Sequence, residues 1–257
     1  IGVGGTSKVY MGTYKGVDVA VKLLFVIDVT RDLVQRVVAE AQLLSRFNGC
    51  ESVVRCHGVV VLPPCIAMVL EWCEKGSLYD VVQAGNTDDG GRKWNWKERV
   101  KFCWGAAQGI HTLHRQGICH RDLKSMNFLV TKDLAVRVTD LDLADDDWNG
   151  NPETTENVQH LECLNWVPPE SLIGKPYRGH GDIYALSMVF SEICSGVVPW
   201  SEFRDPQLIR ERVLKGQRPV LPGDTPTELK NLIELMWDKN PRNRPKSIEV
   251  VETLSKL

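Results

Sequence analysis

The chain has 257 residues with 31 basic and 33 acidic side chains, a formal net charge of −2, and it is 43% hydrophobic and 25% charged. This is the composition of an ordinary globular protein, and its near-neutral charge argues against nucleic-acid binding through a bulk positive field. The most apolar stretches, 17–29 and 53–72, are interrupted by charged residues and prolines. They fall short of the roughly 18 clean residues that a membrane-spanning helix needs. We therefore expect no nucleic-acid partner and no direct membrane insertion.

The cysteines and the start of the chain bear on its cellular setting. The eight cysteines are scattered without a CxxC pair, so the sequence predicts neither a zinc site nor a disulfide framework, only reduced and mostly buried thiols. Position 1 is isoleucine, and no signal-peptide pattern follows. We expect a domain cut from a longer protein, lying in the cytoplasm or on the cytosolic side of a membrane receptor.

The first third of the chain reads as strands around one helix. Short β-branched runs with glycine punctuation predict strands over 8–14, 17–24, 53–61 and 66–70. Between them, Thr30 is a predicted N-cap, followed by apolar residues at helical spacing as far as Leu44 and by a stop at 48–49.

Beyond Gly76 the pattern becomes helical. We predict a polar loop over 84–93 and a helix over 96–116 that Gly117 closes. Later helices are predicted over 182–194, 206–214, 227–237 and 247–257. The sequence thus predicts an α+β fold in which a small β-rich lobe precedes a larger helical lobe, the two joined near 71–76.

Two features of the first lobe point to phosphate binding. Residues 2–9 read GVGGTSKV, and glycines there let backbone N–H groups approach an anion, although a plain glycine hairpin gives the same pattern. Lys22 ends an apolar VAVK strand directly afterwards, so its ammonium can point back under that loop. Glu40 lies seven residues after Leu33 and four before Leu44, which places it on the inner helix face where it could pair with Lys22. A surface carboxylate is the alternative for Glu40.

A second set of polar residues follows the long helix. Residues 120–127 read HRDLKSMN, and DLD stands at 140–142, thirteen residues further on. This spacing supplies Asp122 to orient a hydroxyl and Lys124 to neutralise charge. It also supplies an amide oxygen from Asn127 and a carboxylate from Asp140 as ligands for Mg²⁺.

Together these motifs resemble, in order and nearly from end to end, the eukaryotic protein kinases. Further matching motifs are PPE at 168–170, DIYAL at 182–186 and NPRNRP at 240–245, while NWVPPE at 165–170 resembles the tyrosine-kinase-like group. The resemblance implies a bilobal protein-kinase-like fold forming a single catalytic domain over 1–257. Its N-lobe would cover 1–72, truncated at the start of the glycine-rich loop, and its C-lobe 73–257.

The resemblance also implies ATP and Mg²⁺ as cofactors and assigns roles. Lys22, held by Glu40, would grip the α- and β-phosphates, Asp140 and Asn127 would hold Mg²⁺, and Asp122 with Lys124 would act on the substrate hydroxyl. The adenine would lie between Val9 and Ala20 above and Leu129 below, beside a gatekeeper and a hinge. The residues implied to contact ATP are Gly2, Val3, Gly4, Val9, Ala20, Lys22, Leu70, Glu71, Cys73 and Leu129.

Specificity and regulation follow from the same resemblance. Lys124, two residues after Asp122, matches the serine/threonine-directed members, so protein substrates and regulatory proteins are the implied partners. Arg121 resembles kinases switched by phosphorylation of the activation segment, in which Thr154 and Thr155 are the candidate acceptors. Those two threonines can equally be plain polar loop residues.

Three residues depart from the family pattern. Ser7 replaces the third loop glycine, Asp142 replaces the glycine that ends the metal-binding triplet, and Cys163 stands where a threonine normally contacts the catalytic pair. Asp142 adds negative charge beside Asp140, and a thiol is a weak donor. An active, slow enzyme is expected, and the alternative is a nucleotide-binding scaffold without phosphoryl transfer. A kinase acting on small molecules is disfavoured by the peptide-docking motifs.

Other conspicuous residues are assigned to the fold. Glu170 and Arg244 are expected to form a buried ion pair, and Asp182 to brace the catalytic loop. Three tryptophans at 166, 200 and 237 are expected in the core.

Overall fold

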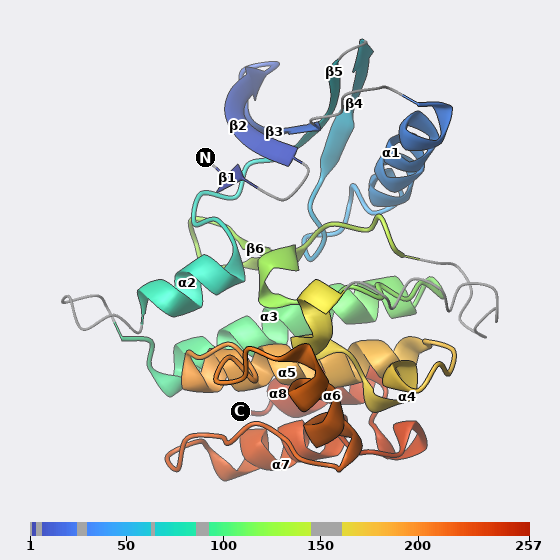
Figure 1. The fold of residues 1–257 in the computed structure, drawn as a ribbon. Helices are drawn as coiled ribbons and strands as arrows, with labels where there is room; N and C mark the ends of the chain where they lie inside the picture. The colour runs from blue at the N-terminus through green and yellow to red at the C-terminus, as the bar shows by residue number, and fades with distance from the viewer. Residues whose placement is uncertain (1, 4–6, 25–29, 63–64, 86–92, 145–160) are drawn as a thin grey trace.

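The computed structural model describes residues 2–3, 7–24, 30–62, 65–85, 93–144 and 161–257, and of residues 2, 3, 7 and 161–163 only the backbone. It consists of a twisted sheet with one helix beside it, above a larger helical part (Figure 1). This is the predicted α+β, bilobal arrangement.

The sheet of the small lobe is antiparallel, with strand order β1-β2-β3-β5-β4. Its strands are β1 (Gly2–Val3), β2 (Ser7–Tyr14), β3 (Val17–Leu24), β4 (Cys56–Leu62) and β5 (Cys65–Glu71). The predicted start of the third long strand at residue 53 is wrong. Val53 forms an isolated bridge with Val138, and the Val54 N–H donates to the Val138 carbonyl at 2.9 Å, so the chain pairs with the helical lobe before β4 begins.

Helix α1 (Arg31–Ser45) begins after the predicted cap, because the Thr30 hydroxyl accepts a hydrogen bond from the Leu33 N–H at 3.2 Å. Its buried positions are 37, 40, 41 and 44, one stripe at helical spacing. This stripe packs against the sheet, and Glu40 is its only charged member.

The larger lobe is helical around a central helix (Figure 1). Its helices are α2 (Leu78–Ala84), α3 (Trp96–His114), α4 (Pro169–Leu172), α5 (Gly179–Ser195), α6 (Pro206–Leu214), α7 (Thr227–Met236) and α8 (Ser247–Leu254), with 3₁₀-helices η1 (Ser125–Asn127), η3 (Leu161–Trp166) and η4 (Pro241–Asn243). Helix α2 was not predicted. Ser77 and Asp80 form a reciprocal capping box, which starts the helix, and Ala84 is its last residue rather than the first of a polar loop.

Helix α5 forms the centre of the core, and its residues 181–194 are all buried. The tryptophans at 166, 200 and 237 are 5%, 5% and 8% exposed, which confirms their expected place in the core. Five of the seven cysteines that the structure describes are buried, and these seven form no disulfide. Within the described ranges, no helix is both long and apolar enough to cross a membrane.

A short hairpin of β6 (Phe128–Val130) and β7 (Val136–Val138) lies between the two parts and packs against α3. The sequence does not predict this hairpin, because three-residue strands carry little periodicity. A Cβ added to Gly105 of α3 would lie 2.9 Å from the Cβ of Val136, so α3 approaches β7 at a distance that only glycine permits.

We predict that Gly105→Ala lowers the free energy of unfolding by about 1–2 kcal/mol, because the overpacking against Val136 exceeds the gain in helix propensity. Urea unfolding followed by circular dichroism measures this. Gly223→Ala is the control, because an added Cβ there meets nothing within 4 Å. Equal stability of the two variants would contradict the close contact.

Candidate active site

The β6–β7 hairpin brings the two polar motifs together. Phe128 is paired with Val138, so the residues just outside the hairpin, Asn127 and Thr139, are also neighbours. The Thr139 N–H donates to the Asn127 carbonyl at 3.0 Å. The segment that ends at Asn127 and the segment that begins at Asp140 therefore lie side by side, although the sequence separates them by twelve residues.

Asp122 is the centre of the first segment. Lys124 Nζ donates to Asp122 Oδ2 at 2.6 Å. Asn127 Nδ2 donates to the Asp122 carbonyl at 2.8 Å and to its Oδ2 at 3.1 Å. An acid, an amine and an amide are thus held within hydrogen-bonding distance by a chain of six residues.

The amide of Asn127 is oriented by these bonds. Because its nitrogen faces Asp122, its side-chain oxygen is left to act as a ligand, and Asp140 directly follows Thr139, whose N–H donates to the Asn127 backbone carbonyl. In the described part of the chain no group of three or more His, Cys, Asp or Glu side chains could hold a metal ion. Two hard oxygen ligands fit Mg²⁺, which commonly takes its other ligands from phosphate and water.

Lys22 comes from the other lobe. It lies on β3, where it is paired with Val9 of β2 and Met68 of β5. Its Nζ donates to Asp140 Oδ1 and lies 3.8 Å from Glu40 Oε1. The lysine therefore joins the sheet, helix α1 and the segment after β7.

The charges around Lys22 set the protonation of the site. Burial raises the pKa of Glu40 to about 7, the charge of Lys22 lowers it, and Asp140 and Asp142 raise it. Burial opposes ionisation of Lys22 and of Asp140, but their mutual attraction prevails, so the pKa of Lys22 is raised and that of Asp140 is lowered. Burial and the charge of Asp140 raise the pKa of Asp142. The carboxyl groups of Glu40, Asp140 and Asp142 can carry more negative charge than the single ammonium group of Lys22 neutralises.

The segment 120–127, called the candidate catalytic loop below, is tied to the central helix α5 through Asp182. Its buried carboxylate accepts from the backbone N–H groups of His120 and Arg121 at 2.9 and 3.1 Å, from the Tyr177 hydroxyl at 2.9 Å and from His114 Nε2 at 2.8 Å. Burial would raise the pKa of Asp182, but the hydrogen bond and charge of His114, together with His120, lower it below its ordinary value. The brace expected at Asp182 is present. The roles of Tyr177 and His114 were missed, because the sequence does not reveal which side chains reach a buried carboxylate.

Two residues of the site hold left-handed backbone conformations. Arg121 has φ of 69° and Asp140 has φ of 66°. Such conformations cost a non-glycine residue of order 1–3 kcal/mol and persist where surrounding bonds fix them. The hydrogen bond from the Arg121 N–H to the Asp182 carboxylate supplies that support for Arg121.

The expected nucleotide-contacting residues line the sheet and the link between the lobes. Ala20 is paired with Leu70 across β3 and β5, and both are buried. Leu129 of β6 forms an isolated β-bridge with Ser77, and the Lys75 N–H donates to the Val130 carbonyl at 3.0 Å. The link between the lobes is therefore hydrogen-bonded to the β6–β7 hairpin.

The link between the lobes at 71–76 carries two features that the sequence does not reveal. Arg137 Nε donates to Glu71 Oε1 at 3.3 Å, which ties β7 to the end of β5. Burial raises the pKa of the Cys73 thiol to about 12, so this cysteine is a poor nucleophile.

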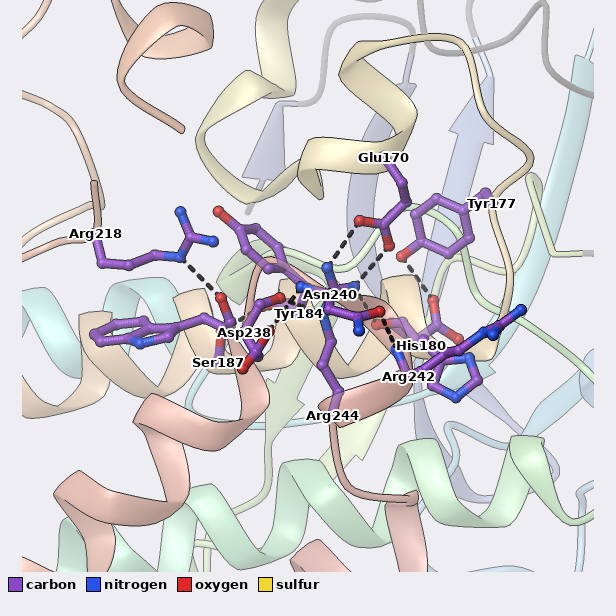
Figure 2. A network of polar contacts seen from close by, with 12 residues as sticks. Glu170, Tyr177, His180, Tyr184, Ser187, Arg218, Asp238, Asn240, Arg242 and Arg244 are labelled. Carbon is purple, nitrogen blue, oxygen red and sulfur yellow. Dashed lines mark hydrogen bonds and ion pairs between the residues drawn. The ribbon is translucent and has the colours of Figure 1, made fainter. Parts of the chain in front are cut away.

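The expected buried ion pair is also present (Figure 2). Arg244 donates to both oxygens of Glu170, at 2.6 and 2.8 Å, and its guanidinium lies 5.1 Å from the centre of the Tyr184 ring. Arg218 lies at the same distance from that ring. The ion pair joins α4 to the segment between η4 and α8.

Some expected site residues fall outside the described part. Gly4, Thr154 and Thr155 belong to ranges that the structure does not describe, and only the backbone is described for Gly2, Val3 and Cys163.

The family model "Protein tyrosine and serine/threonine kinase" matches residues 1–254. Similar curated proteins include "Stress-activated protein kinase alpha" of Dictyostelium discoideum, 31% identical over 99% of this chain. "RGS domain-containing serine/threonine-protein kinase A" of the same organism is 31% identical, and "Serine/threonine-protein kinase STY17" of Arabidopsis thaliana 27% identical, each over 100% of this chain. The chain spans 40%, 22% and 43% of the lengths of these three relatives.

We predict a pH-dependent stability difference between the wild type and Glu40→Gln. The folded-state pKa of Glu40 is raised from 4.5 to about 7. The stabilisation from its protonated form is therefore complete below pH 4.5 and is lost as pH rises to about 7. Between pH 4.5 and 8 the wild type should lose about 3 kcal/mol relative to Glu40→Gln, measured by urea unfolding without nucleotide. Glu234→Gln on the exposed side of α7 is the control, and a constant difference across this range would contradict the assignment.

Proposed function

The chain belongs to the protein tyrosine and serine/threonine kinase family, and from this premise we propose that it transfers the γ-phosphoryl group of ATP to serine or threonine hydroxyls of protein substrates. The family match confirms the resemblance expected from the sequence motifs. One observation carries the proposal: Asp122, with Lys124 and Asn127 bonded to it, lies beside the segment whose Asp140 contacts Lys22.

In the proposed arrangement, nucleotide lies between the lobes. The adenine packs between Val9 and Ala20 on one side and Leu129 on the other, with Leu70 as gatekeeper. The backbone of Glu71 and Cys73 offers it hydrogen bonds, and the glycine loop from Gly2 through Val3 and Gly4 covers the phosphates. When bound, ATP with Mg²⁺ supplies the phosphoryl group and neutralises its charge.

The chain's own residues position the reacting groups. Glu40 holds Lys22, whose ammonium binds the α- and β-phosphates, while Asn127 and Asp140 are the Mg²⁺ ligands. Asp122 accepts a hydrogen bond from the substrate hydroxyl and finally its proton, and Lys124 neutralises charge on the group in transfer. The rate gain comes from positioning and electrostatics, and no covalent enzyme intermediate is needed.

Support for serine/threonine specificity comes from Lys124 and from the relatives, two of whose names contain the words serine/threonine-protein kinase. We further propose that residues 1–257 work as one catalytic domain in the cytoplasm, under the control of regulatory proteins. Thr154 and Thr155 are the proposed sites of activating phosphorylation, whose phosphate would pair with Arg121.

The alternative of an inactive scaffold finds no support. The two residues that motivated it, Asp142 and Cys163, remove no phosphate or metal ligand. The residues to which the proposed mechanism assigns roles are all present: Lys22 contacts Asp140 and lies near Glu40, and Asn127 donates to Asp122.

We predict that Asp122→Asn lowers phosphoryl transfer by about 10²–10⁴-fold, because the amide neither orients the hydroxyl as strongly nor accepts its proton. The measurement is mass spectrometry of the purified chain with Mg²⁺, ATP and a basic protein acceptor. Binding of ATP, followed by thermal shift, should be retained in the variant.

Asp32→Asn, in the exposed first turn of α1, is the matched control and should transfer phosphate at the wild-type rate. Binding of ATP by the wild type without phosphate on any serine or threonine would overturn the proposed function. Phosphate on tyrosine alone would overturn the specificity.

A further inference from the structure

Helix α5 carries a buried carboxyl group that the proposed mechanism does not use. The side chain of Glu192 is fully buried. The Ser125 hydroxyl donates to its Oε1 at 2.7 Å. Ser125 follows Lys124 directly and opens the 3₁₀-helix that ends at Asn127, so this bond fixes the segment between two residues of the candidate site.

The second carboxyl oxygen of Glu192 accepts no such hydrogen bond. Oε2 is buried without a hydrogen-bond partner among the residues described, and so is Nε1 of Trp166. The two atoms are neighbours: η3 packs against α5, and while burial raises the pKa of Glu192 to about 7, the hydrogen bond from Ser125 and the nearby indole N–H of Trp166 lower it. A buried acceptor and a buried donor therefore lie close together, and their contact does not reach full hydrogen-bond geometry.

Trp166 lies in a different segment from Ser125, the 3₁₀-helix η3. It is the last residue of η3 and lies just before α4, whose Glu170 is anchored by Arg244. By family resemblance, η3 and α4, residues 161–172, belong to the surface that receives the substrate peptide, called the substrate platform below. The carboxyl of Glu192 thus stands between the platform and the catalytic loop, and no ion pair to it occurs in the described ranges.

We propose that Glu192 is a positioning residue that couples the substrate platform to the catalytic loop. One of its oxygens holds Ser125, and the other takes the indole N–H of Trp166 when the platform closes on a substrate. Closure then satisfies both buried polar atoms and holds Lys124 and Asn127 in place around Asp122. This inference rests on the proposed function.

The first experiment removes only the indole N–H, with Trp166→Phe. We expect kcat to fall about fivefold with an unchanged KM for ATP, because orientation of the catalytic loop is lost while the nucleotide site stays intact. The control is Trp200→Phe, another buried tryptophan whose Nε1 has no hydrogen-bond partner in the described structure. Thermal unfolding of both variants separates a loss of stability from a loss of positioning.

The second experiment tests whether the two contacts act through one carboxyl group. Ser125→Ala should lower kcat to a similar extent, and the double variant Ser125→Ala, Trp166→Phe should lose no more than the worse single variant. Glu192→Leu should also lower kcat, because neither the Ser125 hydroxyl nor the indole N–H then has a side-chain acceptor at this position. The control is Ser187→Ala on the same helix, whose hydroxyl donates to the backbone carbonyl of Tyr184.

Amide hydrogen exchange of residues 120–129 decides the coupling independently of turnover. We expect faster exchange in Trp166→Phe than in Trp200→Phe. Equal exchange and equal kcat in these two variants, or additive effects in the double variant, would overturn the coupling. Absence of transfer by the wild type would instead overturn the proposed function, and the exchange measurement would still decide the coupling.

Discussion

The carboxylate of Asp182 holds the rest of the site in place. It lies in the fully buried part of α5 and accepts hydrogen bonds from two backbone N–H groups of the catalytic loop. His114 of α3 and Tyr177 complete its surroundings. Loss of one partner of a buried charge commonly costs about 3–5 kcal/mol. The left-handed backbone of Arg121 is maintained by these bonds, so the direction in which Asp122 leaves the loop depends on a residue sixty positions away in the chain.

A second constraint is the balance of charge around Lys22. The lysine contacts Asp140 and lies near Glu40, and Asp142 adds a further negative charge whose influence reaches Glu40. Burial raises the pKa values of Glu40 and Asp142, and the neighbouring carboxylates raise them further, because one ammonium cannot neutralise three carboxylates at low local dielectric. A divalent cation bound at Asn127 and Asp140 would relieve this excess. The electrostatics and the proposed ligand chemistry are therefore consistent with each other.

Local sequence rules predicted most of the elements but missed those whose cause is not periodicity. The β3 strand and α6 were predicted with the observed ends, and the cap at Thr30 lies where expected. Helix α2 was missed because a capping box, rather than an apolar stripe, starts it. The beginning of β4 was misplaced because Val53 and Val54 pair with Val138, a partner that strand propensity cannot identify. Burial of Glu40 followed from its place in an apolar stripe, since helical spacing alone fixes that face.

The sequence by itself determined the family, the bilobal α+β organisation and the residues that carry the proposed chemistry, because these depend on residue types at fixed spacings. Only the tertiary structure decided which side chains support them. The partners of Asp182 and the buried Ser125–Glu192–Trp166 arrangement bring together residues from distant elements. These groups affect stability because they are buried: an unpaired polar atom costs no free energy in water but costs much in the core. No spacing rule within a single segment encodes that distinction.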